Sequence, residues 1–231
     1  MILDLHPQLS VQKLSVGNEQ TPLLVIDNFV ADPDRLVRRA ASRMYGKGGR
    51  YFPGIRSEAP LSYQQLFTVK LRDLLFQFFG LKGTGLSFKL CHYSVVTTPP
   101  SQLEFLQRIP HFDSPNRNAL ASVHYLFRGN FGGTGFYRHR STGYESINPE
   151  RAEGYFKILT EESKGPNAPG PAYIAGDTPL YEQTALQDGV FNRVLIYPRN
   201  VLHSGCISPE CVFDPDPTKA RLSINTFIDV L

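Results

Sequence analysis

The chain has 231 residues, 41% of them hydrophobic, which suits one globular domain of ordinary size. Its 24 basic and 21 acidic residues are spread along the sequence and give a net charge of only +3, so we expect no nucleic-acid partner. No run of about 18 uninterrupted apolar residues is present, so we expect no membrane association through a spanning segment.

The cysteines and the N-terminal segment favour a cytoplasmic protein. Cys91, Cys206 and Cys211 are odd in number and lack Cys-x-x-Cys spacing, so reduced thiols fit better than a disulfide framework. The N-terminal segment has neither the basic region nor the apolar stretch of a secretion signal. Cys206 and Cys211 follow His203 and would suit a soft-metal site, although small residues in or beside a strand are the more ordinary interpretation.

The first part of the chain predicts one short strand and two helices. Residues 23–26 are all apolar and read as a buried strand. Asp32 and Pro33 have the types preferred at a helix N-cap and first turn, and Gly46 is a plausible stop. A second apolar stripe at helical spacing runs from about Ser62 to Phe79. We expect these helices to form a layer on the outside of a sheet.

From Leu86 onward the apolar period changes to two, and 18 prolines and 19 glycines separate short apolar runs, which predicts a largely β architecture. The strand candidates are Leu86–Val96, Ala119–Phe127, Thr134–Tyr137, Phe191–Tyr197 and Leu222–Val230. Asn148 and Pro149 open an intervening helix. The Gly- and Pro-rich segment 163–171 predicts a loop, which we interpret as a candidate lid.

His111, Asp113 and His203 are the candidate metal ligands. In a strand, residues i and i+2 point to the same face, so His111 and Asp113 can reach one metal ion. Two histidines and one carboxylate are the minimal ligand set of a mononuclear non-heme iron(II) site with open coordination positions.

Arg221 and Ser223 share one face of the last predicted strand. A guanidinium inside a small barrel is costly unless an anion pairs with it. A bidentate pair with a carboxylate would satisfy Arg221, with the Ser223 hydroxyl as an additional donor. A structural Asp or Glu is the more ordinary partner, and a dicarboxylate co-substrate is the other.

Two further features flank these residues. Tyr125 lies among apolar residues on one strand face and could aim its hydroxyl into a barrel. The pair Gly132-Gly133 predicts a tight turn before the next strand. The compact basic run Arg138-His139-Arg140 reads as a solvated strand end, with attraction of an anionic substrate as a secondary alternative.

In this order, the His-x-Asp pair, the tyrosine strand, the Gly-Gly pair, the distal His203 and Arg221 resemble the Fe(II)/2-oxoglutarate-dependent oxygenases, in a bacterial-type form of their prolyl-hydroxylase-like branch. The resemblance covers residues 86–231. It implies a double-stranded β-helix (jelly-roll, cupin-like) core behind N-terminal supporting elements in residues 1–85, together forming a single domain over 1–231.

The resemblance also implies roles for individual residues. His111, Asp113 and His203 would bind Fe(II). Arg221 would bind the distal carboxylate of 2-oxoglutarate, assisted by Ser223. Tyr125 and Tyr93 would complete the co-substrate site.

The activity implied is hydroxylation of a small-molecule, amino-acid or peptidyl substrate. Two other functions use the same ligand triad: a cupin-like metal- or ligand-binding protein without oxygen chemistry, and a zinc hydrolase or isomerase. Neither needs a buried cation placed to receive a dicarboxylate. No feature of the sequence indicates a homo-oligomer.

Overall fold

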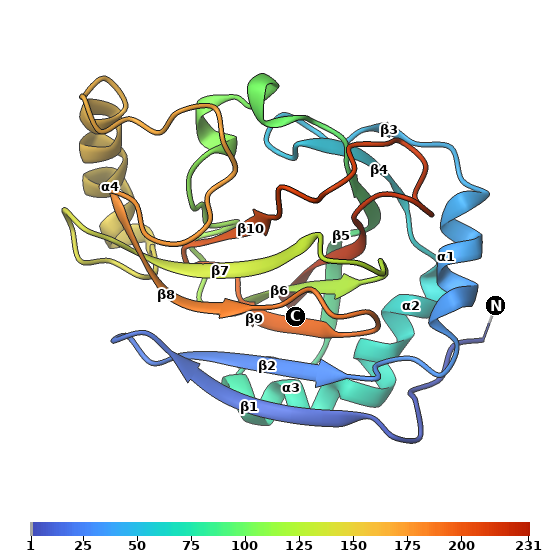
Figure 1. Ribbon diagram of the computed structural model, residues 1–231. Helices are drawn as coiled ribbons and strands as arrows, with labels where there is room; N and C mark the ends of the chain where they lie inside the picture. Colours follow the sequence, from blue (N-terminus) through green and yellow to red (C-terminus); the bar gives the residue numbers. More distant parts are fainter. Residues whose placement is uncertain (1) are drawn as a thin grey trace.

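The computed structural model describes residues 2–231 and contains two antiparallel sheets that lie face to face (Figure 1). The larger sheet has eight strands in the order β1-β2-β9-β6-β11-β5-β4-β3, and the smaller has the order β10-β7-β8. The strands of the larger sheet are β1 (Ser10–Val16), β2 (Thr21–Asp27), β3 (Gly46–Lys47), β4 (Gly54–Glu58), β5 (Leu86–Val96), β6 (Ala119–Tyr125), β9 (Val194–Pro198) and β11 (Leu222–Val230). Those of the smaller sheet are β7 (Gly132–His139), β8 (Tyr181–Gln187) and β10 (His203–Ile207).

The chain alternates between the two sheets after β5. It crosses to the edge of the smaller sheet, where His111 pairs with His203, and returns as β6. Strands β7 and β8 then extend the smaller sheet, β9 returns to the larger, β10 to the smaller, and β11 ends between β5 and β6. The prediction of a mainly β protein is confirmed, and the alternation is that of a jelly-roll-like sandwich.

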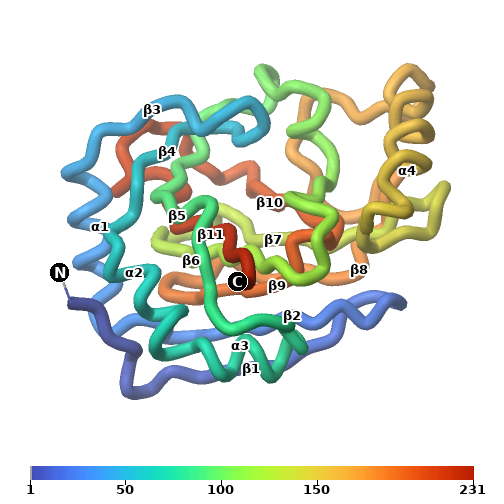
Figure 2. Tube along the Cα trace, turned by 180° about the vertical axis from the view of Figure 1, so that it is seen from behind, coloured from blue at the N-terminus to red at the C-terminus, as the bar shows by residue number. Residues whose placement is uncertain are grey.

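The N-terminal helical segments lie beside the larger sheet (Figure 2). They are α1 (Pro33–Ala41) and a continuous helical run made of α2 (Leu61–Gln65), a π-helical segment (Leu66–Leu71) and α3 (Arg72–Phe79). Asp32 caps α1 by accepting a hydrogen bond from the Arg35 amide at 2.9 Å. Gly80 ends α3 with a φ of +61°, a conformation that favours glycine. Helix α1 stops at Ala41, before the predicted end at Gly46.

Apolar residues of these helical segments share a core with the larger sheet. Leu36 and Phe67 are fully buried and belong to the same apolar cluster as Ile196 and Ile224. A second cluster, which includes Tyr125, Phe136 and Tyr197, contains residues of both sheets. The face of the larger sheet that turns away from α1–α3 is therefore the inner face of the sandwich.

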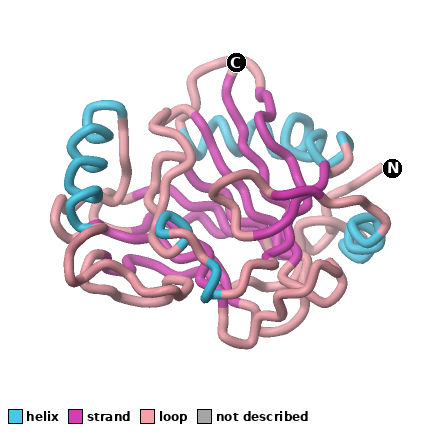
Figure 3. Tube along the Cα trace, turned by 90° about the horizontal axis from the view of Figure 1, so that it is seen from above, coloured by secondary structure: helices cyan, strands magenta, loops and turns pink. Residues whose placement is uncertain are grey.

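The remaining helix is α4 (Pro149–Glu162), which follows β7, and two 3-10 turns cover Pro100–Gln102 and Phe105–Gln107. Seen from above, the strands occupy the centre, with helices and long loops around them (Figure 3). Segment 163–171 is a loop, as predicted. None of the helices within residues 2–231 has the length and apolar character needed to cross a bilayer.

The pair Gly132-Gly133 opens β7 and lets it approach both neighbouring strands. A Cβ atom on Gly132 would lie 1.8 Å from the Cys206 carbonyl oxygen, and one on Gly133 would lie 1.9 Å from the Gln187 carbonyl oxygen. Gly132 also has a φ of +82°. The pair therefore allows close packing of three strands in addition to ending the connection from β6.

Candidate metal centre

His111, Asp113 and His203 converge at the edge of the smaller sheet. One potential ligand atom of each residue lies within 4.8 Å of the other two. Asp113 Oδ1 is 3.8 Å from His111 Nε2, and Asp113 Oδ2 is 3.6 Å from His203 Nε2. Two imidazole nitrogens and one carboxylate thus face a common point, as the ligand set of a mononuclear iron(II) site requires.

Backbone pairing fixes this arrangement. The His111 amide donates to the His203 carbonyl, and the His203 amide donates to the His111 carbonyl, each at 2.9 Å. The Asp113 amide donates to the Arg199 carbonyl at 2.8 Å. His111 and His203 are 92 positions apart in the sequence and meet through pairing at this sheet edge, so spacing alone cannot predict their convergence.

The ring of His203 is oriented for ligation. Its Nδ1 lies 3.0 Å from the Val201 carbonyl oxygen, which can only accept a hydrogen bond, so Nδ1 carries the proton. The lone pair is then on Nε2, the atom that faces Asp113. A backbone carbonyl in this position is a common outer partner of metal-ligating histidines.

Asp113 carries a buried carboxylate oxygen that no hydrogen-bond donor within residues 2–231 satisfies. Its side chain is 10% exposed, and Oδ2 is buried without a hydrogen bond from any of residues 2–231. Half of the His111 side chain is exposed, but desolvation of its ring by the surrounding residues, together with the neighbouring His203, lowers its pKa, which keeps the imidazole neutral near pH 7. A bound divalent cation would pair with the orphaned carboxylate oxygen and take the two imidazole nitrogens as further ligands, so these residues fit a metal.

Arg221 lies at the start of β11 and is only 5% exposed. Its Nη2 donates to the Gly133 carbonyl at 3.0 Å, and its Nε has no partner. No Asp or Glu among residues 2–231 forms an ion pair with it. Arg199, which is 9% exposed, is paired with Asp229 at 2.8 Å, so the fold does supply carboxylates to other buried arginines. The ordinary alternative, a structural Asp or Glu beside Arg221, is not observed.

Tyr125 and Ser223 stand directly opposite each other on β6 and β11. The guanidinium carbon of Arg221 is 5.4 Å from the centre of the Tyr125 ring. The Tyr125 hydroxyl shares a 2.7 Å hydrogen bond with Thr134 Oγ1. Ser223 donates its hydroxyl to Asn225 Oδ1 at 2.7 Å. Arg221, Ser223 and Tyr125 therefore lie together on the inner face.

Tyr93 does not join them. It pairs with Ile224 of β11 and is buried in the apolar cluster shared with α1–α3, on the opposite face of the larger sheet. Its hydroxyl has no hydrogen-bond partner among residues 2–231. Cross-strand partners point to the same face, so Tyr93 follows Ile224 outward while Ser94 follows Ser223 inward. Its expected place beside the co-substrate is wrong.

Two inner-face residues were not recognised in the sequence. Tyr197 of β9 is 1% exposed, and its ring centre lies 4.7 Å from that of His203. Burial raises its pKa, with the Asp113 charge adding to the effect, so Tyr197 is a neutral hydroxyl beside the centre. Arg56 of β4 pairs with Ser94 and so faces inward. Its strand has only five residues, which leaves little periodic signal in the sequence.

The basic run 138–140 is fully paired with carboxylates. Arg138 contacts Glu145 and Glu182, and Arg140 contacts Asp177. His139 is completely buried and bonded to Glu162, so the prediction of a solvated strand end is wrong for this residue. No unpaired charge therefore remains in this run to attract an anionic substrate.

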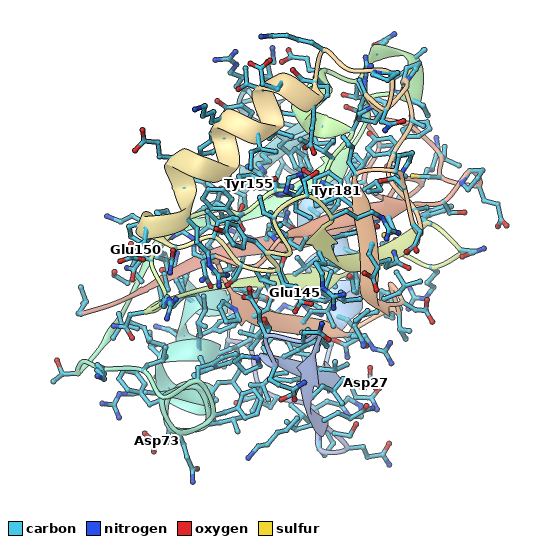
Figure 4. All side chains as sticks on the ribbon, turned by 90° about the vertical axis from the view of Figure 1, so that its left-hand side faces the viewer. Asp27, Asp73, Glu145, Glu150, Tyr155 and Tyr181 are labelled. Atoms are coloured by element: carbon cyan, nitrogen blue, oxygen red, sulfur yellow. The ribbon has the colours of Figure 1, made fainter. Side chains whose placement is uncertain are left out.

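Glu145 is labelled in Figure 4, as are Tyr155 and Tyr181, whose hydroxyl oxygens are 3.0 Å apart.

The cysteines lie outside the triad. All three are free thiols, and none belongs to the group of potential ligands formed by His111, Asp113 and His203. The thiol of Cys206 lies 3.1 Å from the Tyr137 hydroxyl, and burial raises its pKa. The structure thus favours the ordinary interpretation of Cys206 as a small buried residue in β10.

Comparison with known proteins places the fold. No curated protein matches the sequence. Among solved structures, HygX from Streptomyces hygroscopicus, with nickel and 2-oxoglutarate bound, is similar with a TM-score of 0.50 and 10% identity, covering 92% of this chain and 84% of HygX. At that identity the likeness concerns the fold alone. Residues 7–228 match the profile described as "Family of unknown function (DUF6445)", so the chain belongs to the DUF6445 family.

Proposed function

We propose that the protein is an Fe(II)- and 2-oxoglutarate-dependent oxygenase built on a double-stranded β-helix. The observation that carries this proposal is the combination of a His-Asp-His group with a buried arginine that has no carboxylate partner. The fold likeness to HygX, which was solved with 2-oxoglutarate bound, supports it. A zinc hydrolase or a simple metal-binding cupin would leave the cost of burying Arg221 unexplained.

His111, Asp113 and His203 would hold the metal. This ligand set would leave part of the metal's coordination sphere open to a co-substrate. When bound, iron(II) supplies the activation of dioxygen that couples decarboxylation of 2-oxoglutarate, giving succinate and carbon dioxide, to oxidation of the substrate. Hydroxylation is the outcome we propose.

Arg221 and Tyr125 would bind the far end of 2-oxoglutarate. The Arg221 Nε has no partner and its Nη2 donates only to the Gly133 carbonyl, so the guanidinium retains donors for a carboxylate, and the buried setting strengthens such a pair. Burial raises the pKa of Tyr125 to about 12, with Arg221 opposing, so its hydroxyl stays protonated and can donate. The Ser223 hydroxyl lies beside them and would exchange its bond to Asn225 for one to the co-substrate.

The remaining inner-face residues would separate the centre from bulk water. Tyr197 packs against His203, and Phe127 lies 5.4 Å from the guanidinium carbon of Arg221. His111, by contrast, has a half-exposed side chain. The substrate would therefore approach from the His111 side, over a centre whose opposite side is closed.

The test is anaerobic absorption spectroscopy of the protein with Fe(II) and 2-oxoglutarate. A visible charge-transfer band forms only when the oxoacid chelates the bound iron, and we expect it in the wild type. His111→Ala should abolish the band, while His6→Ala, far from the centre in the sequence, should keep it. A wild type without the band, or a His111→Ala variant with it, would refute the proposal.

A further inference from the structure

Arg56 is a second cation of the inner face that lacks an acidic partner. It lies on β4, near the open edge of the larger sheet. Its Nε donates to the Ser94 hydroxyl at 3.1 Å and its Nη1 to the Gly48 carbonyl at 3.2 Å. No Asp or Glu in the described chain, residues 2–231, forms an ion pair with it, and no hydrogen bond uses its Nη2.

Register places Arg56 in line with the proposed co-substrate residues. Arg56 stands opposite Ser94, Ser94 opposite Ser223, and Ser223 opposite Tyr125. Cross-strand partners share a face, so these four residues form one inward row across four strands. Tyr125 occupies the inner end of this row and Arg56 the edge.

The guanidinium is held in place and only partly solvated. Its carbon lies 4.1 Å from the centre of the Phe52 ring, which covers one face. Desolvation lowers the pKa of Arg56 to about 10, although the charge of Asp113 opposes the shift. Asp113, whose charge opposes this shift, is one of the candidate metal ligands.

A basic groove adjoins this position. It has a volume of about 410 Å³ and includes the side chains of Arg43, Lys47 and His92 beside Arg56, with Glu58 as its one carboxylate. Exposed cations here would raise the local concentration of an anionic ligand. The Nη2 edge of Arg56 then offers donors with the geometry that suits an oxyanion.

We propose that Arg56 binds an oxyanion group of the substrate, a carboxylate or a phosphate, and so orients an acidic small molecule over the centre. This assignment rests on the proposed oxygenase function. Each of the two arginines would then bind a different anion. Arg221, buried in the sandwich, would take the co-substrate, and Arg56, at the sheet edge, would take the substrate.

The experiment uses benzoate, phenyl phosphate and uncharged benzamide as probes. Zn(II)-loaded protein is saturated with 2-oxoglutarate, which blocks the Arg221 position, and each probe is titrated by ligand-observed NMR. We expect at least one of the two anions to bind the wild type about tenfold more tightly than benzamide, as a charge-assisted hydrogen bond implies. Which anion is preferred distinguishes a carboxylate substrate from a phosphate one.

Three variants complete the design. Arg56→Gln should abolish the preference for the anion, and Arg56→Lys should retain part of it, which guards against a folding defect in the first variant. Arg50→Gln removes an exposed arginine that stacks on Tyr51 and should change nothing. Equal binding of the anions and benzamide by the wild type, or an unchanged preference in Arg56→Gln, would overturn the assignment.

The same titration without metal or 2-oxoglutarate separates the two proposals. If the anaerobic iron band is absent but Arg56 still selects an anion, the oxygenase function fails and the anion site stands. If the band forms normally in Arg56→Gln and no anion preference exists, the anion site alone is refuted.

Discussion

Arg221 and Tyr125 lie on neighbouring strands with the guanidinium carbon 5.4 Å from the ring centre, and no acidic side chain within residues 2–231 pairs with that guanidinium. A cation buried to this extent destabilises a fold unless an anion pairs with it. We therefore expect an anionic ligand at Arg221. Under the proposed function this ligand is the oxoacid, which other proteins with a His-Asp-His group would not require.

Replacing Arg221 by Gln should weaken 2-oxoglutarate binding by roughly 10- to 100-fold, since hydrogen bonds to a charged group contribute about 1.5–3 kcal/mol. Metal affinity should change little, because Arg221 supplies no metal ligand. Calorimetric titration of 2-oxoglutarate into Zn(II)-loaded protein measures the loss. Arg140→Gln, which removes a surface cation paired with Asp177, is the matched control. Equal losses of metal and 2-oxoglutarate binding would contradict the role of Arg221.

Two tyrosine substitutions should give opposite results. Tyr125→Phe removes a buried donor beside Arg221 and should weaken 2-oxoglutarate binding by about tenfold. Tyr93→Phe should leave that binding unchanged, because Tyr93 lies on the other face of the sheet and its hydroxyl bonds to none of residues 2–231. The same calorimetric titration compares the pair. A larger effect from Tyr93→Phe than from Tyr125→Phe would show that the sheet faces are assigned wrongly.

Asp113→Asn should separate metal binding from stability. The amide cannot replace the carboxylate as a charged ligand, so saturating Zn(II) should no longer raise the melting temperature. In the wild type, metal at about 100 times its dissociation constant should add about 2.7 kcal/mol of stability. Without metal, the variant should be at least as stable as the wild type, because Asp113 Oδ2 is buried without a partner. Thermal unfolding with and without Zn(II) checks both statements. A metal-free variant that is markedly less stable would indicate a structural role for this carboxylate.

His124 should make the protein sensitive to acid. It is completely buried, and burial lowers its pKa to about 3, with the Asn192 hydrogen bond opposing. The unfolded chain takes up a proton at this residue below about pH 6.5 while the folded chain does not, so stability is lost as the pH falls from about 6.5 toward 3. In this window His124 contributes a slope of up to about 1.4 kcal/mol per pH unit.

Urea unfolding between pH 7 and 4 tests this contribution. His124→Gln should unfold more easily at pH 7, because it loses stacking on Tyr63, yet show a shallower dependence on pH than the wild type. Identical pH slopes for the two proteins would mean that His124 does not titrate on unfolding.

The sequence predicted long regular elements best. Strands β5 and β11 have the expected bounds, because alternation over many residues leaves little choice of face or limits. Strands β1, β3, β4, β8 and β10 were not predicted from the sequence. Strands β3, β4 and β10 have only two to five residues, too few for a clear alternation of apolar and polar side chains. The π-helical segment between α2 and α3 likewise has no signature in apolar spacing.

Site residues followed the same rule. His111 and Asp113 are two positions apart, so their approach to a common metal could be predicted from the geometry of the local backbone. Tyr93 was misplaced because its face depends on register against β11, where it stands opposite Ile224. His139 was expected in solvent because its partner, Glu162, comes from another element. Arg56 could not be recognised from the sequence, because the face to which it points depends on the pairing of β4 with β5.

The most direct test of the central claim is turnover of 2-oxoglutarate under isotopically heavy dioxygen. Protein supplied with Fe(II) and ascorbate should convert 2-oxoglutarate to succinate that carries one heavy oxygen atom, measured by mass spectrometry. His203→Ala should abolish this conversion, and Arg140→Gln should retain it. Absence of succinate in the wild type, succinate without the heavy atom, or unchanged turnover in His203→Ala would contradict an oxygenase centred on His111, Asp113 and His203.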